Sequence, residues 1–150
     1  MSVSVHGTAV LAGAHGLLIR GASGSGKSRL ALALLERGAR LIADDRVHLS
    51  ACHGRVVATA PAGIAGRIEL RGRGLLSVPH EQSALVRLVV DIVADEGLAR
   101  LPEDHQLSTV LLGVVLPRQP VPAAFDHALA LVSAALQALS PGRNMGLRTA

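Results

Sequence analysis

The chain has 150 residues, of which 49% are hydrophobic and 17% charged, a balance that excludes a disordered protein and allows one domain with a buried core. The net charge of +4 comes with a single aromatic residue, Phe125, so the stacking side chains typical of nucleic-acid binding are missing. Cys52 is the only cysteine, which excludes an intrachain disulfide, and no apolar run reaches the roughly 18 residues of a membrane-spanning helix. We therefore expect one domain over residues 1–150, soluble and cytoplasmic, that binds neither nucleic acid nor a membrane.

The first part of the chain is predicted to contain short strands followed by a helix. Alternating apolar residues predict strands at residues 3–6 and 8–12, and the short apolar run 16–20 is typical of a buried strand. Residues 29–37 are rich in helix formers, and Gly38 follows them at the position where glycine commonly ends a helix. A glycine-rich loop lies between the last of these strands and the helix.

That loop has the pattern G-x-x-x-x-G-K-S of a phosphate-binding P-loop. It consists of Gly21, Ala22, Ser23, Gly24, Ser25, Gly26, Lys27 and Ser28. Glycines let backbone N–H groups approach a phosphate, Lys27 brings a positive charge to the β- and γ-phosphates, and the Ser28 hydroxyl can hold Mg²⁺. The alternative is an ordinary Gly/Ser turn that happens to precede Lys-Ser. Since the motif lies between a strand and a helix, as a working P-loop requires, we interpret it as a nucleotide-phosphate site.

Beyond the P-loop helix the pattern is dominated by strands. They are expected at residues 40–43, 47–50, 55–58, 85–94 and 110–116, the second and third forming a hairpin. Residues 123–139 follow three prolines and have the amphipathic pattern of a helix, and residues 140–150 are expected to be a frayed tail. A P-loop protein that alternates strand and helix throughout would show more helices. We therefore predict an α/β fold with a mixed β-sheet containing hairpins, one P-loop helix and a C-terminal helix.

A P-loop works with a nearby carboxylate that organises Mg²⁺ or the attacking group, and the sequence offers two candidates. Asp44 and Asp45 end the strand that follows the P-loop helix, so a right-handed crossover would bring them beside the loop. Asp91 lies in the apolar run 88–93, which could be a Walker-B strand. The pair could instead lie on a solvated turn, and Asp91 could be an inward charge on an edge strand. We favour Asp44 and Asp45, because one carboxylate can accept a hydroxyl proton while the other holds its partner groups.

Glu69 lies among three arginines, Arg67, Arg71 and Arg73. In isolation this pattern is typical of a charged surface strand. Beside a bound nucleotide, Glu69 could supply a second contact to Mg²⁺, and the arginines could bind phosphate oxygens.

Four stretches together resemble one known family, the catalytic domain of HPr kinase/phosphorylase. They are His6-Gly7, the P-loop, the run 34–45 that ends in Ala43-Asp44-Asp45, and the run 68–74 that reads I-E-L-R-G-R-G. The match is dense over residues 6–76. The R-G-x-x-L-x-A-D-D run after a P-loop is far more specific than the P-loop itself.

The resemblance implies a reaction and a set of roles. Members use ATP and Mg²⁺ to phosphorylate a serine of the phosphocarrier protein HPr, and many reverse the reaction with inorganic phosphate, releasing pyrophosphate. By resemblance, Lys27 and the loop backbone bind the ATP phosphates, and Ser28 with Glu69 binds Mg²⁺. One residue of the aspartate pair, Asp45 rather than Asp44, takes the serine proton, and His6 orients that pair. Arg100 corresponds to the family's later catalytic arginine.

The family also suggests a homo-oligomer, commonly a hexamer, and this chain is similar to a short bacterial form that begins at the kinase domain. One departure concerns the reverse reaction. The family's segment for dephosphorylation has a P-V-x-P-G-R-N-like run, whereas residues 120–122 lack the Gly-Arg-Asn, and Pro-Gly-Arg-Asn occurs only at 141–144. Two alternatives stay open: a P-loop phosphotransferase that acts on a small hydroxyl substrate, and a regulatory nucleotide-binding module without catalysis.

Overall fold

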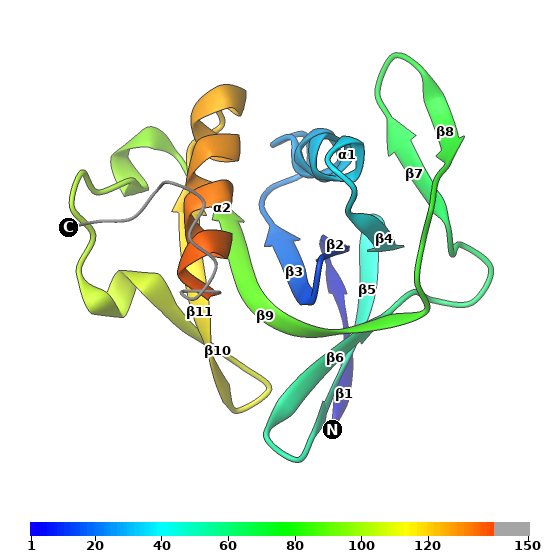
Figure 1. Ribbon diagram of the computed structural model, residues 1–150, viewed down its shortest axis with the longest axis horizontal. Coiled ribbons are helices and arrows are strands. Elements are labelled where there is room, and N and C mark those ends of the chain that lie inside the picture. Colours follow the sequence, from blue (N-terminus) through cyan, green and yellow to red (C-terminus); the bar gives the residue numbers. More distant parts are fainter. Residues whose placement is uncertain (140–150) are drawn as a thin grey trace.

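The computed structural model describes residues 1–139, which form a curled β-sheet with two α-helices and a separate hairpin (Figure 1). The strands are β1 (Ser2–His6), β2 (Thr8–Ala12), β3 (His15–Arg20), β4 (Arg40–Ala43), β5 (Arg46–Cys52), β6 (Arg55–Thr59), β7 (Arg67–Leu70), β8 (Gly74–Ser77), β9 (Ser83–Ile92), β10 (Ser108–Leu111) and β11 (Val114–Val121). The helices are α1 (Lys27–Glu36) and α2 (Phe125–Leu139), with short 3₁₀ turns η1 (Asp95–Gly97) and η2 (Asp104–Leu107). The predicted mixed α/β fold is confirmed, and strands 8–12 and 40–43 have the predicted bounds.

The main sheet has the strand order β1-β5-β6-β9-β3-β2-β4, and β11 with its partner β10 joins it alongside β9. The long strand β9 holds the sheet together. Its first residues pair with β6 in the antiparallel direction, and the rest lies between β3 and β11, parallel to both. Strands β7 and β8 form a hairpin outside this sheet.

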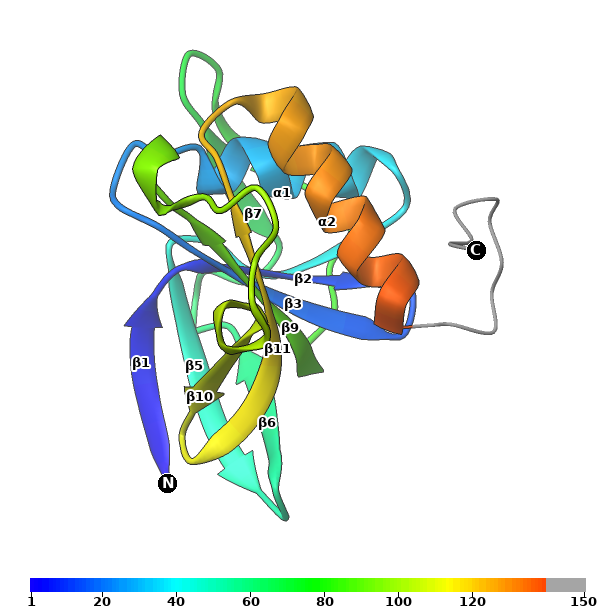
Figure 2. The ribbon, with the colours of Figure 1, turned by 90° about the vertical axis from the view of Figure 1, so that its left-hand side faces the viewer.

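The two faces of the sheet are covered by different elements. Leu17 and Ile19 of β3 belong to one buried cluster with Leu30 of α1 and Val132 of α2. Leu18, between them in the sequence, points to the opposite face and joins a second cluster formed with β5, β6 and β10. Both helices lie next to each other on the first face (Figure 2). Strand β3 is therefore buried on both sides, which explains its unbroken apolar run.

The order of strands brings three chain segments to one edge of the sheet. β2 is antiparallel to both β3 and β4, so β3 and β4 run in the same direction with β2 between them. The P-loop follows the end of β3, and Asp44 follows the end of β4. Thr8, the first residue of β2, pairs with Ile19 near the end of β3. The predicted crossover therefore brings Asp44 to the P-loop edge, although β4 is not the immediate neighbour of β3.

Three details differ from the sequence-based expectation. Residues 110–116 are two strands rather than one, joined by a turn in which Leu112 and Gly113 both have positive φ, 50° and 78°. Leucine is not a residue typical of turns with positive φ, so the apolar run 110–116 predicts a single continuous strand. β11 then continues through Pro117 and Pro120. Residues 67–73, whose pattern in isolation is typical of one charged surface strand, belong to the β7–β8 hairpin, which spans residues 67–77.

The predicted tail at 140–150, including the Pro-Gly-Arg-Asn run, lies outside the described residues. Within residues 1–139, no helix combines the length and apolar character needed to cross a membrane.

Candidate active site

Asp44 is the centre of a hydrogen-bond network that joins three segments. The Ser28 hydroxyl of the P-loop donates to Asp44 Oδ1 at 2.7 Å, and the Thr8 hydroxyl of β2 donates to the same oxygen at 3.0 Å. The backbone N–H of Glu69 donates to Asp44 Oδ2 at 2.9 Å. Asp44 is only 8% exposed and Thr8 is fully buried, so these bonds satisfy a carboxylate that water barely reaches.

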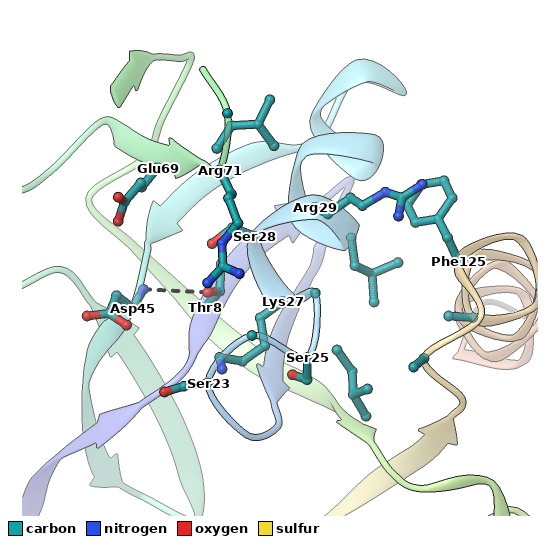
Figure 3. Close-up of a pocket in the computed structure, with 18 of the residues that line it drawn as sticks. Thr8, Ser23, Ser25, Lys27, Ser28, Arg29, Asp45, Glu69, Arg71 and Phe125 are labelled. Atoms are coloured by element: carbon teal, nitrogen blue, oxygen red, sulfur yellow. Dashed lines mark hydrogen bonds between the residues drawn. The ribbon is translucent and has the colours of Figure 1, made fainter. Parts of the chain in front are cut away.

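Asp45 has the opposite environment, although it is the next residue. Its side chain is 75% exposed and lines the pocket, and its backbone has a φ of +70°. Asp is among the residues that tolerate this left-handed conformation best. The Asp45 N–H points back to the Thr8 hydroxyl at 3.5 Å, and the Asp45 carbonyl accepts from Gly7 N at 3.1 Å (Figure 3). The left-handed residue at the junction of β4 and β5 thus separates a buried carboxylate from one that faces the pocket.

His6 lies beside Asp45, as the resemblance implied. Its Nδ1 atom is 3.5 Å from Asp45 Oδ1, and both side chains are substantially exposed. Gly7, the next residue, packs closely against β3, because a Cβ at this residue would lie 2.9 Å from the Ile19 carbonyl oxygen. In the His6-Gly7 pair, the glycine therefore meets a packing requirement and the histidine supplies a polar side chain beside Asp45.

The P-loop wraps around its own lysine. Lys27 is 7% exposed, and its ammonium donates to the Gly21 and Ala22 carbonyls at 2.8 and 3.1 Å. It is also the only lysine in the chain. A Cβ at Gly21 would lie 2.6 Å from Ser25 Oγ and 3.1 Å from Ile92 Cβ, so a larger residue would force these side chains to shift. Within the described part of the chain, that buried hydroxyl oxygen has no hydrogen-bond partner, and a phosphate bound in the loop would supply one.

These residues surround a pocket of about 820 Å³. Its lining includes His6, Thr8, the loop from Ser23 to Ser28, Asp45, Glu69, Arg71 and Arg73. Glu69 and Arg71 reach it from the β7–β8 hairpin, on the same side as Asp45 (Figure 3). The structure therefore brings together the P-loop, the aspartate pair, His6 and Glu69, which are separated by up to 63 positions in the sequence.

Two candidate residues lie outside the lining of this pocket, Arg100 and Asp91. Arg100 is exposed and does not line the pocket. Asp91, the alternative carboxylate, lies on the central strand β9 rather than on an edge strand. It accepts two hydrogen bonds from Arg20, at 2.7 and 2.8 Å, and one from Arg118. Burial raises the pKa of the Asp91 carboxyl, but the two arginines outweigh burial and hold that pKa below its ordinary value. Asp91 is therefore the anionic centre of a structural ion-pair network.

Comparison with known proteins identifies the family. The model of the HPr serine kinase C-terminal domain matches residues 1–146. The chain belongs to this family. An HPr kinase/phosphorylase of Limosilactobacillus reuteri is 36% identical over 140 residues, which cover 86% of this chain and 43% of that protein. One of Levilactobacillus brevis is 34% identical over 153 residues, covering 95% of this chain and 49% of that protein. The chain thus spans less than half the length of these two relatives.

A solved structure gives the same result for the fold of the HPr kinase domain. The Hpr(Ser) kinase/phosphatase from Coxiella burnetii superposes with a TM-score of 0.77 at 25% identity, covering 94% of this chain and 99% of that one. The curled sheet with two helices is therefore the fold of an HPr kinase domain and not a distortion peculiar to this sequence.

The oxygen atoms of this site have the chemistry that Mg²⁺ requires. Ser28, Asp44 and Glu69 offer a hydroxyl and two carboxylates, the hard oxygen donors that Mg²⁺ prefers. Residues 1–139 contain no group of three or more His, Cys, Asp or Glu side chains that could hold a metal ion. Mg²⁺ in phosphate-transfer sites usually binds through one or two carboxylates plus substrate phosphates, so its binding here would depend on the nucleotide.

Sequence reasoning missed Thr8. The residue stands at the polar end of an apolar strand, where a threonine is unremarkable, and only the pairing of β2 with β3 and β4 brings its hydroxyl to both aspartates. Burial of the Thr8 hydroxyl beside the P-loop would have marked it as part of the site. The sequence does not carry that signal, because alternation alone does not tell whether the first residue of a strand is buried.

Proposed function

We propose that this domain transfers the γ-phosphoryl group of ATP to a serine hydroxyl of the protein HPr, with Mg²⁺. The observation that carries the proposal is the 2.7 Å hydrogen bond from Ser28 to Asp44, because it couples the phosphate-binding loop directly to the aspartate pair. The names of the relatives support HPr as the acceptor. Since the chain spans less than half of their length, acceptor and activity are proposed for this domain rather than carried over.

The loop and Lys27 bind the phosphates in this proposal. Lys27 is already held inside the loop by two backbone carbonyls, so its charge is positioned before any ligand arrives. A phosphate oxygen, which is a stronger acceptor for an ammonium, would compete for those hydrogen bonds. Arg71 and Arg73 line the same pocket and provide further positive charge for phosphate oxygens. We assign no step to Arg100, because it does not line the pocket.

Asp45 is the proposed general base. As the exposed carboxylate of the pair, it can meet the hydroxyl of an incoming serine, whereas Asp44 is engaged by three donors. In the forward direction Asp45 takes the serine proton as the oxygen–phosphorus bond forms and the bond to the leaving ADP oxygen breaks. His6, 3.5 Å from Asp45, orients that carboxylate. In the reverse direction, with inorganic phosphate as attacking group, Asp45 would return the proton to the serine.

Ser28 and Glu69 would hold Mg²⁺, with Asp44 orienting the Ser28 hydroxyl so that its lone pairs face the pocket. Bound Mg²⁺ would neutralise charge on the phosphate oxygens. As an ATP-dependent enzyme the protein would work in the cytoplasm. We also propose that it is a homo-oligomer, which light scattering after gel filtration would test.

The proposal is tested by incubating the protein with γ-labelled ATP, Mg²⁺ and purified HPr, and mapping the label by mass spectrometry. We expect one phosphate on one serine of HPr, and loss of that label when inorganic phosphate is added in excess if the reverse reaction operates. The control is HPr with its labelled serine changed to alanine. ATP binding without any transfer to HPr would refute the kinase assignment.

A further inference from the structure

The pocket has two chemically different sides, with the P-loop between them. Asp45 and Glu69 lie on one side, and Phe125 lies on the other, beyond Lys27 and Ser28 (Figure 3). The second side is lined by apolar side chains. They are Leu30, Ile92, Pro122, Ala123, Phe125 and Ala128. This side offers no carboxylate, so its chemistry does not suit proton transfer or metal binding.

Phe125 is the single aromatic residue among 150, and it lies in this pocket. It begins α2 and is only partly buried, which is unusual for the largest apolar side chain of a protein built from Leu, Val and Ala. The guanidinium carbon of Arg29 lies over the ring, 4.3 Å from its centroid. Within residues 1–139, Arg29 has no ion pair or hydrogen bond to hold it, so this ring contact fixes its guanidinium group.

We propose that Phe125 and Arg29 form a stacking platform for the base of the nucleotide. The inference rests on the proposed function and extends it to the base of the nucleotide, which the P-loop does not contact. The γ-phosphate must point to Asp45, where the acceptor hydroxyl is activated. The α-phosphate and the nucleoside then extend to the other side of the loop, toward the apolar wall. Arg29 is in the first turn of α1, two residues after Lys27, and so lies next to the phosphates.

Both members of the platform are planar, and both favour an aromatic ligand. Aromatic rings and guanidinium planes stack with any base, because every base has a π-face. Ile92, Pro122 and Ala123 have no side-chain donors or acceptors to read the edge of a base. We therefore expect the platform to bind adenine and guanine nucleotides with similar affinity, and to bind both more tightly than a phosphate chain without a base.

The test compares three ligands, ATP, GTP and inorganic tripolyphosphate, each with Mg²⁺, by titration calorimetry on the full chain. Two variants remove the planar faces and keep other properties: Phe125→Leu keeps an apolar side chain at the start of α2, and Arg29→Lys keeps the charge. We expect each variant to bind ATP and GTP about 5-fold or more weakly, the lower end of base–aromatic stacking, with tripolyphosphate affinity unchanged within about 2-fold. Val115→Ala on exposed β11 is the control, with all three affinities unchanged.

The outcomes separate this inference from the proposed function. If wild-type protein binds ATP no more tightly than tripolyphosphate, or if Phe125→Leu leaves ATP affinity unchanged, the platform is overturned while the phosphate site stands. An equal loss for ATP and tripolyphosphate would mean that the residues support the loop rather than contact the base, which also overturns it. If wild-type protein binds neither ligand, the phosphate site fails, and the proposed function fails with it.

Discussion

Asp44→Asn is the sharpest test of how this site is organised. In the wild-type protein the Ser28 hydroxyl donates its hydrogen to Asp44 Oδ1, which leaves its lone pairs free for a cation. Asparagine has one acceptor oxygen, and the Glu69 N–H can be satisfied only by that oxygen. The amide NH₂ must then face Ser28 and Thr8. Ser28 becomes an acceptor, and its hydrogen turns toward the position that Mg²⁺ would occupy.

The structure gives the size of the effect. Substitution of a residue that orients a metal ligand usually costs about 10- to 100-fold in metal affinity or activity, so the Mg²⁺ concentration for half-maximal rate should rise by that factor. The free energy of unfolding should change only modestly. A hydrogen bond to a charged group contributes about 1.5–3 kcal/mol, but the variant keeps the shape and removes a buried charge, so a loss of about 1–2 kcal/mol is expected.

The assay is the initial rate of phosphoryl transfer over a range of Mg²⁺ concentrations, with urea unfolding on the same samples. Thr8→Val is the matched control, because it removes one donor to the same Asp44 oxygen and leaves the Ser28 bond intact. It should cost about 1 kcal/mol of stability with little change in Mg²⁺ dependence. If Asp44→Asn has the Mg²⁺ dependence of wild type, the argument that Asp44 orients Ser28 is wrong.

Three further predictions follow from single contacts. Lys27→Ala should abolish phosphoryl transfer with the fold retained, and unaltered transfer would contradict the assignment of the site. Because Lys27 is the only lysine, bound ATP should protect this side chain of the wild-type protein from amine-reactive labelling. Asp45→Asn should lower the transfer rate by about 10²-fold or more, as expected for a general base, whereas a near-wild-type rate would shift that role to Asp44. Asp91→Asn should cost about 2 kcal/mol by leaving Arg20 and Arg118 unpaired. The folded-state pKa of Asp91 is lowered, so its carboxylate stabilises the folded protein above the ordinary pKa of 3.8, and this stabilisation is lost as the pH falls below that value. The free energy of unfolding in urea should therefore depend less on pH in that acid range for Asp91→Asn than for wild type.

The sequence was sufficient to predict the elements that local signals define. The P-loop, the helix after it and strand 40–43 follow from glycine spacing, helix formers and a short apolar run. The meeting of Asp44 with the loop was also predictable, because a crossover after a P-loop helix has a fixed hand. The hydrogen-bond partners of Asp44 were not predictable, because β2 lies between β3 and β4 and contributes Thr8.

The surroundings of Asp91 and Arg100 could not be predicted, because they depend on long-range contacts. The role of Asp91 depends on Arg20 and Arg118, which are 71 and 27 positions away in the sequence, and an apolar strand with one aspartate has the same pattern whether that aspartate binds a metal or an arginine. The exclusion of Arg100 from the pocket depends likewise on the loop path after β9. Neither can be read from periodicity, which reports only which face of an element is buried.

The adjacent aspartates can serve different tasks because Asp45, at the junction of β4 and β5, has a left-handed backbone conformation with a φ of +70°. Asp44 is buried and accepts hydrogen bonds from three donors, whereas Asp45, which has a positive φ, lines the pocket with an exposed side chain. The left-handed turn keeps both carboxylates at the loop while giving them different exposure. The left-handed conformation at Asp45, which aspartate tolerates better than most residues, is therefore part of how the site combines a buried carboxylate with an exposed one.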